Sequence, residues 1–288
     1  MRALVTGAGG QLGQALLATV PAQIEASGFT RAKLDIGDPA ALRREIERVA
    51  PDVVINAAAY TAVDRAESEE AQAFRVNATG VVNLAEACAE RKVRLVHIST
   101  DFVFDGGHSR PYRPADETAP QSIYGKSKLA GETAALSAPG NLVVRTAWVY
   151  GNHGQNFVRT MLRLMRERKE LRVVADQIGT PTHTRSLAWA IWSLIERDAR
   201  GLLHFTDAGT ASWYDFAVAI QEESVRLGLL AREIPIIPIA TADYPTRATR
   251  PVYSVLDKSE CWALLGAPAR HWRAELRDML TREKELDG

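Results

Sequence analysis

The first half of the chain alternates short apolar runs with segments of helical spacing. Such continuous apolar runs are typical of strands buried on both faces, since a strand with one solvated face alternates apolar and polar residues. The predicted strands are 3–6, 24–30, 51–59, 93–100 and 141–151, and the predicted helices are 11–20, 39–49, 71–90 and 124–136. Asp38 is suited to cap the second helix. This alternation predicts a parallel sheet covered by helices on both faces.

After residue 151 the rhythm changes. We predict helices at 157–167, 184–196, 213–227 and 256–265, a strand with a loop at 171–182, a strand at 201–207, and a PIIPI segment followed by a turn-rich YPTRATRP. The predicted fold is α/β, a Rossmann-type doubly wound parallel sheet with a smaller, partly interleaved C-terminal substrate domain. The predicted dinucleotide-binding domain is 1–150, to which 184–207 returns, and the substrate-binding domain is 151–183 with 208–288.

Composition narrows the class of protein. The 288 residues are 46% hydrophobic, enough for a large core, and 35 basic residues balance 35 acidic ones. This balance gives no excess of basic residues of the kind that indicates nucleic-acid binding. Two cysteines make neither a disulfide framework nor a zinc set, and no apolar run has the length of a membrane span. We therefore expect a cytoplasmic protein with no membrane or nucleic-acid partner.

A glycine turn follows the first strand. In GAGGQLG, Gly7, Gly10 and Gly13 stand between a strand and a helix, where glycine permits a tight turn and close approach to a pyrophosphate. The helix N-terminus, from Gln11 and Leu12, then faces the phosphates. The alternative is a tight turn with no ligand. The position at the start of an alternating chain favours a dinucleotide.

The end of the second strand bears on the choice of cofactor. An NAD site usually places a carboxylate there for the ribose hydroxyl, whereas this chain has Thr30 and Arg31. A cation at this point suits the extra phosphate of NADP, although a solvated surface arginine is the plain alternative. We predict NADPH, with NADH left open. Asp35 and Ile36 lie just beyond and are candidates for adenine contacts.

A hydroxyl and a Tyr–Lys helix follow in the second half of the sheet. Thr100 ends a buried strand, at the edge where ligands bind, and Tyr124 and Lys128 lie one helical turn apart. When hydride reaches a ketone carbon, the oxygen needs a hydrogen-bond donor and then a proton. Tyr124 is suited to give that proton, and we expect the Lys128 ammonium to lower the pKa of the phenol. Thr100 would hold the carbonyl oxygen, and Lys128 also the nicotinamide ribose.

Motifs along nearly the whole chain resemble the dTDP-4-dehydrorhamnose reductase family of extended short-chain dehydrogenases/reductases. They are TGAGGQLG, LDIGD, PDVVINAAAYTAVDRAE, VNATG, STDFVFDG, DETAP, YGKSKLAGE, RTAWVYG, GQNFVRTML, DQIGTPT, SWYDFA and YPTRATRP. The resemblance implies NADPH-dependent reduction of the C4 ketone of dTDP-4-dehydro-L-rhamnose to dTDP-L-rhamnose. It implies Thr100, Tyr124 and Lys128 as the catalytic set, and also a homodimer and a need for Mg²⁺. No acidic cluster that would hold a metal stands out. Ser122 departs from the asparagine more usual there.

The remaining candidate residues line the cofactor and substrate. Ala57, Ala58, Ala59 and Tyr60 follow the third strand and suit close backbone approach to the cofactor, although small-residue packing explains the alanines equally well. The substrate candidates are Val63, Thr100, Asp101, Val103, Phe104, Trp148, Asn156 and Arg250. A guanidinium suits a pyrophosphate because it bonds in two places. We interpret Asp64 as part of a solvated helix start and Trp213 as helix-packing core.

Three other functions compete with a 4-reductase. A 4,6-dehydratase would want a second acid after Asp101, and Phe102 stands there instead. A 4-epimerase or another nucleotide-sugar reductase of the same fold is compatible with the same residues. A non-catalytic NADP-binding regulatory subunit needs no proton donor, which makes the joint presence of Thr100, Tyr124 and Lys128 an argument against it.

Overall fold

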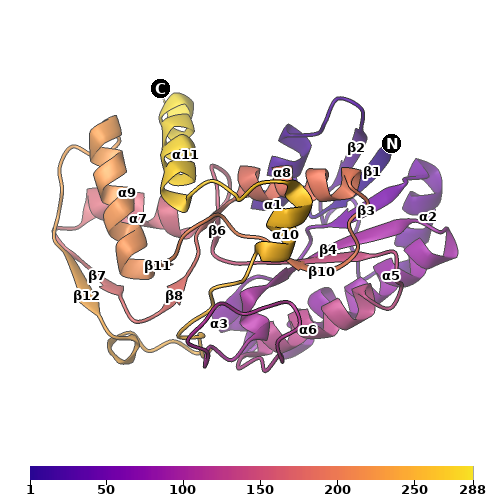
Figure 1. Ribbon diagram of the computed structural model, residues 1–288, viewed down its shortest axis with the longest axis horizontal. Coiled ribbons are helices and arrows are strands. Elements are labelled where there is room, and N and C mark those ends of the chain that lie inside the picture. The colour runs from indigo at the N-terminus through magenta and orange to yellow at the C-terminus, as the bar shows by residue number, and fades with distance from the viewer. Residues whose placement is uncertain (288) are drawn as a thin grey trace.

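A six-stranded parallel sheet forms the centre of the computed structural model, which describes residues 1–287 (Figure 1). Every neighbouring pair of its strands is parallel. The spatial order is β10 (Gly201–His204), β5 (Leu142–Thr146), β4 (Arg94–Thr100), β3 (Val53–Asn56), β1 (Arg2–Thr6) and β2 (Glu25–Phe29). The order reverses beside β1, which is the doubly wound arrangement predicted from the alternating pattern.

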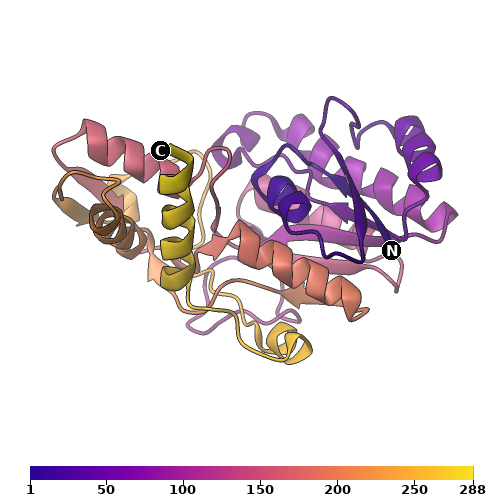
Figure 2. The same cartoon turned by 90° about the horizontal axis from the view of Figure 1, so that it is seen from above.

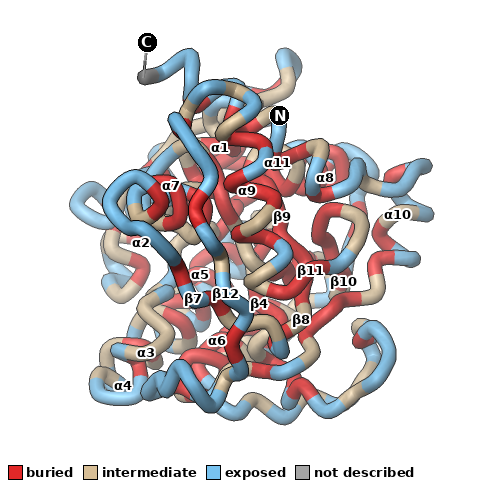
Figure 3. Tube along the Cα trace, turned by 90° about the vertical axis from the view of Figure 1, so that its left-hand side faces the viewer, coloured by how far each residue is buried: buried red, intermediate tan, exposed pale blue. Residues whose placement is uncertain are grey.

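Helices cover both faces of this sheet. On one face α1 (Gln11–Ala18) and α8 (Thr184–Glu196) pack side by side (Figure 2). Their leucines join one buried cluster with the sheet valines. On the other face α2 (Pro39–Val49), α5 (Gly80–Glu90) and α6 (Ile123–Ala135) cover a second cluster. Asp38 caps α2 by accepting from two backbone N–H groups, as predicted. The strands of the sheet are mainly buried inside the molecule, and exposed segments lie around them (Figure 3).

The long helix predicted at 71–90 is interrupted. It consists of α4 (Glu70–Phe74), a π-helical turn (Arg75–Thr79) and α5. Asn77 in that turn donates to the Tyr60 carbonyl and the Ser127 hydroxyl and accepts from the Tyr60 N–H. A Cβ on Gly131 of α6 would stand 2.1 Å from the Asn77 carbonyl oxygen. The π-helical turn thus accompanies a very close approach of α6, the helix that carries Tyr124.

The strand predicted at 141–151 ends early. β5 stops at Thr146, and Trp148 adopts a left-handed backbone with φ of 46°. The short β6 (Val149–Tyr150) then pairs with β9 (Thr182–His183) instead of continuing in the main sheet. The bend at Trp148 is therefore where the chain leaves the sheet for the second unit.

The second unit is built around a separate core. It contains α7 (Phe157–Glu167), α9 (Trp213–Leu227), α11 (Trp272–Asp287) and the parallel pair β7 (Leu171–Val174) and β12 (Ile236–Ile239). Small pieces complete it, namely β8 (Ile178–Gly179) paired with β11 (Ala211–Ser212). Their apolar side chains form one buried cluster that includes Phe216 and Trp272.

One stretch differs from the predicted domain plan, and one helix was not predicted at all. The helix α10 (Ser259–Leu265) lies within 208–288, yet its Cys261 and Leu265 pack in the cluster of α8 and the main sheet, so this stretch joins the first unit. The helix α11 is absent from our sequence prediction. Its core residues Trp272, Leu276, Met279 and Leu280 have helical spacing, so the signal was present among many charged neighbours.

Candidate active site

The candidate site lies where β1, β3 and β4 end at the same edge of the sheet. Gly7 follows β1, Ala57 follows β3, and Thr100 is the last residue of β4. The carboxyl ends of parallel strands beside a switch in strand order form the usual ligand crevice of such sheets. The sequence-predicted cofactor and catalytic residues are brought to this edge.

The glycine turn leaves no room for side chains. Gly7 has φ of 68°, and a Cβ there would lie 2.5 Å from the Ala58 nitrogen. A Cβ on Gly13 would lie 2.2 Å from the Gly7 carbonyl oxygen. Gly10 stands at the N-cap of α1, so the first N–H groups of that helix meet no capping side chain. These features fit a dinucleotide pyrophosphate, which takes backbone N–H donors at a helix N-terminus.

Gln11 and Leu12 follow the turn in different roles. The Leu12 side chain is buried in the core beneath the sheet face, so only its backbone is open to a ligand. Gln11 is bridged to the second unit, because Asn156 donates to its Oε1 at 2.9 Å. The turn is thereby tied to the start of α7.

The end of β2 presents a cation beside the turn. Arg31 is exposed, and the nearby Asp35 forms its ion pair with Arg75 at 2.8 Å. A hydrogen bond from the Gly37 N–H and the Arg75 charge lower the pKa of Asp35. The Ile36 side chain is buried against Gly80, so its role toward an adenine would be limited to its backbone and edge.

The segment after β3 passes directly beneath the glycine turn. Ala57 and Ala58 supply the atoms that a Gly7 side chain would strike, and Ala59 is exposed. The Tyr60 backbone is held by Asn77, while its hydroxyl donates to Glu69 at 2.7 Å. The small side chains are therefore needed for this backbone packing, whatever they contribute to ligand binding.

Thr100 and Tyr124 lie next to each other. Ser122 caps α6 by accepting from the Gly125 N–H at 3.1 Å, so the serine that replaces the usual asparagine still starts the helix. Burial raises the pKa of the Tyr124 phenol to about 12, and a hydrogen bond with the Thr100 hydroxyl opposes that shift in part. Thr100 also donates to Asp101 at 3.0 Å. Tyr124 is thus held as a protonated phenol.

Lys128 is buried one turn further along α6. Its Nζ donates to the Ile98 carbonyl oxygen at 2.6 Å and lies 3.4 Å from His97 Nε2. Burial lowers the pKa of Lys128 to about 8, against an opposing effect of Glu132. The expectation that Lys128 lowers the pKa of Tyr124 is not met in this structure. Burial of the phenol dominates, and the amine is directed at β4.

Asp101 and the residues after it form the floor of the site. Burial raises the pKa of the Asp101 carboxyl to about 6, although hydrogen bonds from Ser254 and Thr100 oppose the change. The side chains of Val103 and Phe104 are fully buried in a small cluster with Tyr112 and Leu256. Their predicted substrate contacts are corrected accordingly, since only their backbone atoms remain available.

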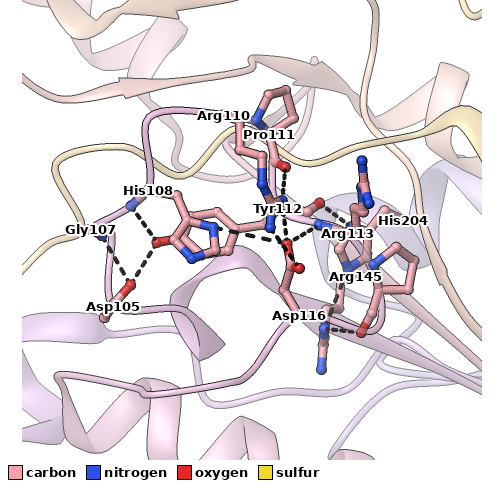
Figure 4. A network of polar contacts seen from close by, with 11 residues as sticks. Asp105, Gly107, His108, Arg110, Pro111, Tyr112, Arg113, Asp116, Arg145 and His204 are labelled. Atoms are coloured by element: carbon pink, nitrogen blue, oxygen red, sulfur yellow. Dashed lines mark hydrogen bonds and ion pairs between the residues drawn. The ribbon is translucent and has the colours of Figure 1, made fainter.

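A polar network fixes the loop that leaves this floor (Figure 4). Asp105 accepts from the Tyr112 hydroxyl at 2.6 Å, and Tyr112 stacks on Phe104 with centroids 4.2 Å apart. Further along, Arg110 pairs with Asp116 at 2.7 Å. Arg145 lies over the Phe104 ring at 4.9 Å. These contacts fix the loop that follows Thr100 and Asp101, and so help to hold these two residues in place.

Trp148 forms a wall with a second tryptophan. Its ring stacks on Trp213 with centroids 3.5 Å apart and an angle of 6° between the planes. A Cβ on Gly179 would stand 2.5 Å from the Trp148 ring, so the indole is held on its other side as well. Trp213 is half-buried, packs against the core of the second unit and donates to Gln177, which agrees with its interpretation as a helix-packing residue.

Two substrate candidates are engaged by the protein itself. Asn156 caps α7, and its amide donates to Gln11 and to the Gly151 carbonyl, so it bridges the two units, and its contact with substrate stays a prediction. Two guanidinium nitrogens of Arg250 donate to the two carboxylate oxygens of Asp64, at 2.7 and 3.1 Å. The Arg250 hydrogen bond lowers the pKa of Asp64. Asp64 is therefore a partner of Arg250 rather than only a solvated helix start.

Two kinds of feature are absent from the part of the chain that the structure describes. Among residues 1–287, no group of three or more His, Cys, Asp or Glu side chains is arranged to hold a metal ion. None of the described helices combines the length and apolar character needed to cross a bilayer. The Mg²⁺ implied by the resemblance receives no support from the described residues.

A glycine turn, a strand-end threonine and a Tyr–Lys helix on a doubly wound parallel sheet define the class of short-chain dehydrogenases/reductases. Comparison with protein families agrees with this class and identifies a particular family within it. The family model described as RmlD substrate binding domain matches residues 1–285, and the chain belongs to this family. The match spans both units, so it concerns the whole architecture rather than the nucleotide-binding half alone.

Individual relatives are similar along almost their full length. A dTDP-4-dehydrorhamnose reductase of Mycobacterium tuberculosis is 46% identical, over 97% of this chain and 92% of its own. A dTDP-4-keto-6-deoxy-D-glucose reductase of Streptomyces niveus is 42% identical, over 96% of this chain and 95% of its own. The crystal structure of a dTDP-4-dehydrorhamnose reductase from Bacillus anthracis in complex with NADP has a TM-score of 0.92 and 35% identity, covering 98% of this chain and 99% of that one.

Proposed function

We propose that this protein is an NADPH-dependent reductase that converts the C4 ketone of dTDP-4-dehydro-L-rhamnose to the alcohol of dTDP-L-rhamnose. The observation that carries the proposal is the adjacency of Thr100, Tyr124 and buried Lys128 at the strand edge. Its support from comparison is the similarity to reductases of this name over nearly the whole chain. The enzyme would belong to the biosynthesis of dTDP-rhamnose, a cell-wall sugar donor.

The chain supplies the oxygen side of the reaction. NADPH, when bound, provides the hydride that adds to the carbonyl carbon. Thr100 would hold the carbonyl oxygen by its hydroxyl, and Tyr124 would give that oxygen its proton as the carbon–oxygen double bond becomes single. A phenol with a pKa of about 12 keeps its proton until the oxygen has become strongly basic. Lys128, with a pKa of about 8, can then return a proton to Tyr124.

Backbone and cationic groups would hold the cofactor. The turn residues Gly7, Gly10 and Gly13 with the N-terminus of α1 are proposed for the pyrophosphate, and Arg31 for the 2′-phosphate. The fit rests on the close-packed glycines, which any Cβ at Gly7 or Gly13 would disrupt. The remaining proposed contacts come from Gln11, Leu12, Thr30, Asp35, Ile36, Ala57, Ala58, Ala59, Tyr60, Tyr124 and Lys128.

Three residues are proposed for the substrate side. Arg250 is proposed to bind the pyrophosphate in two places, for which its bonds to Asp64 must be shared or exchanged. Val63 and Trp148 are proposed to border the sugar. Because one similar enzyme is named for a 4-keto-6-deoxy-D-glucose substrate, reduction of that neighbouring sugar is the second candidate function.

Stoichiometry tests the reaction directly. The protein is incubated with dTDP-4-dehydro-L-rhamnose and excess NADPH, and absorbance is followed to completion. A reductase consumes one NADPH per sugar, and a product NMR spectrum gives the configuration at C4. An epimerase consumes none on balance, and a binding protein leaves the sugar unchanged. Faster reduction of dTDP-4-keto-6-deoxy-D-glucose in the same assay would favour the second candidate.

Replacing Arg31 with alanine should weaken NADPH binding more than NADH binding. The lost charge-assisted contact to the 2′-phosphate is worth about 1–3 kcal/mol, and NADH carries no such phosphate. Fluorescence titration with both cofactors measures the difference. Arg44→Ala, which removes another exposed cation on α2, serves as the control. An equal loss for both cofactors would show that Arg31 is an ordinary surface residue.

Two broader expectations remain predictions. Nucleotide sugars and NADPH are cytoplasmic metabolites, and we therefore expect the protein to act there. The homodimer implied by the resemblance awaits a measurement of mass in solution.

A further inference from the structure

A buried chain of polar groups runs from the end of β1 to Lys128. The Thr6 hydroxyl donates to Asn56 Oδ1 at 2.7 Å, and Asn56 Nδ2 lies 3.0 Å from His97 Nδ1. On the far side of the ring, His97 Nε2 lies 3.4 Å from Lys128 Nζ. All four residues are buried. The chain therefore joins three neighbouring strands to the amine of the candidate site.

The direction of these hydrogen bonds is determined by one backbone group. The Ala58 N–H can only donate, and it donates to Asn56 Oδ1 at 3.2 Å. The NH₂ of Asn56 consequently faces His97 and can only donate, so His97 Nδ1 must accept. Burial and the Lys128 charge hold the pKa of His97 well below its ordinary value, so the ring is neutral. Its single proton then sits on Nε2, which faces Lys128.

The Nε2–H group of His97 interacts differently with the neutral amine and the ammonium form of Lys128. The neutral amine of Lys128 has a lone pair that can accept from Nε2–H, while one of its own hydrogens goes to the Ile98 carbonyl. The ammonium form has no lone pair and would meet donor with donor. Hydrogen bonding to a neutral form disfavours the charged one.

We propose that His97, oriented by Asn56, is a positioning residue that makes Lys128 release its proton at a lower pH than an apolar neighbour would. The proposal rests on the proposed function, because it concerns the proton supply of the same site. It gives the strand histidine a purpose beyond packing. Lys128 would exchange its proton with Tyr124 close to neutral pH, which suits a residue that must reload the phenol in each turnover.

The other ionisable groups around Lys128 do not replace this effect. On α6 itself, Tyr124 is a protonated phenol, and Glu132 raises the pKa of Lys128. Glu132 is paired with Arg145 of β5 at 2.7 Å. Asp101, in the turn after β4, acts on Tyr124. Against these, His97 is the group that contacts Nζ with a fixed donor.

The pH dependence of turnover tests the proposal. In His97→Met the donor is gone, the ammonium of Lys128 is favoured, and the alkaline limb of kcat should move up by about half to one pH unit. Asn56→Asp, of nearly the same size, can only accept from the ring when its carboxyl is ionised. It should turn the Nε2 lone pair toward Lys128 and move the limb in the same direction. His204→Met is the control, since His204 is also buried in this sheet but contacts Arg145.

A second measurement does not depend on activity. Nitrogen-15 NMR of the histidine-labelled protein reports the tautomer of each ring, and His97 is expected with its proton on Nε2. A proton on Nδ1 would overturn the proposal even if the protein reduces the sugar normally. So would coincident alkaline limbs in the parent and Asn56→Asp, and that comparison also decides the matter if His97→Met does not fold. Failure of NADPH consumption by the parent, with the expected tautomer intact, would count against the proposed function alone.

Discussion

Replacing Tyr124 with phenylalanine is expected to lower the turnover of ketone reduction by about 10²-fold or more. The phenylalanine ring keeps the packing against Phe102 but carries no proton to give. Because the reacting oxygen gains charge only in the transition state, the loss should fall on kcat and leave the affinity for NADPH similar. Steady-state kinetics with the keto sugar and a fluorescence titration with NADPH measure the two effects.

A matched variant separates chemistry from packing. Tyr214→Phe removes the hydroxyl of a half-buried tyrosine on α9 that packs against the core of the second unit, and should leave turnover near that of the parent. If Tyr124→Phe retained full turnover as well, Tyr124 would have no part in proton transfer. The proton would then have to come from another group that touches the site, of which Asp101 is the nearest candidate with a raised pKa.

Features that depend on near neighbours in sequence were predictable. The strands that end at Thr6 and Thr100 follow from short apolar runs bounded by turn residues, whereas the third strand, predicted over 51–59, ends earlier at Asn56. The glycine turn also follows, since its three glycines stand between a strand and a helix. These signals depend on backbone geometry over a few residues, which local pattern captures well.

Features that depend on distant contacts were not predictable. Asp64 and Arg250 are 186 residues apart, so nothing in either segment announces their ion pair. The left-handed backbone at Trp148 belongs to a bulky residue that local preference disfavours. It is held by stacking on Trp213. A histidine inside an apolar strand, such as His97, reads as core until its two neighbours are placed beside it.

The electrostatics of the site show why a motif alone is a poor guide to pKa. One helical turn brings Tyr124 and Lys128 to the same face of α6, and that spacing suggests mutual stabilisation of their charges. Both residues are buried, however, and desolvation disfavours the charged form of each. The phenol therefore resists losing its proton and the amine resists gaining one. At neutral pH Tyr124 is therefore protonated, which is the form that can act as an acid toward a ketone oxygen.

The largest effect on stability is expected at the buried ion pair that joins the catalytic helix α6 to β5. Glu132 and Arg145 are each 3% exposed, and two hydrogen bonds of 2.7 and 2.9 Å join them. Arg145→Met would leave the Glu132 carboxylate buried without its partner, at a cost of about 3–5 kcal/mol in the free energy of unfolding. Urea denaturation followed by circular dichroism measures the loss. The same change should loosen the loop above, because Arg145 also supports Phe104.

The double variant Arg145→Met with Glu132→Gln distinguishes the cause of that loss. If an unpaired buried charge is responsible, neutralising Glu132 should restore a large part of the stability, since an apolar or neutral replacement of a buried pair is often tolerated. Arg163→Met breaks the exposed pair with Glu167 on α7 and should cost no more than about 1 kcal/mol. A double variant as unstable as Arg145→Met alone would instead assign the loss to the contact of the Arg145 guanidinium with the Phe104 ring. In that case the active-site loop is anchored by the Phe104 contact and not by the ion pair with Glu132.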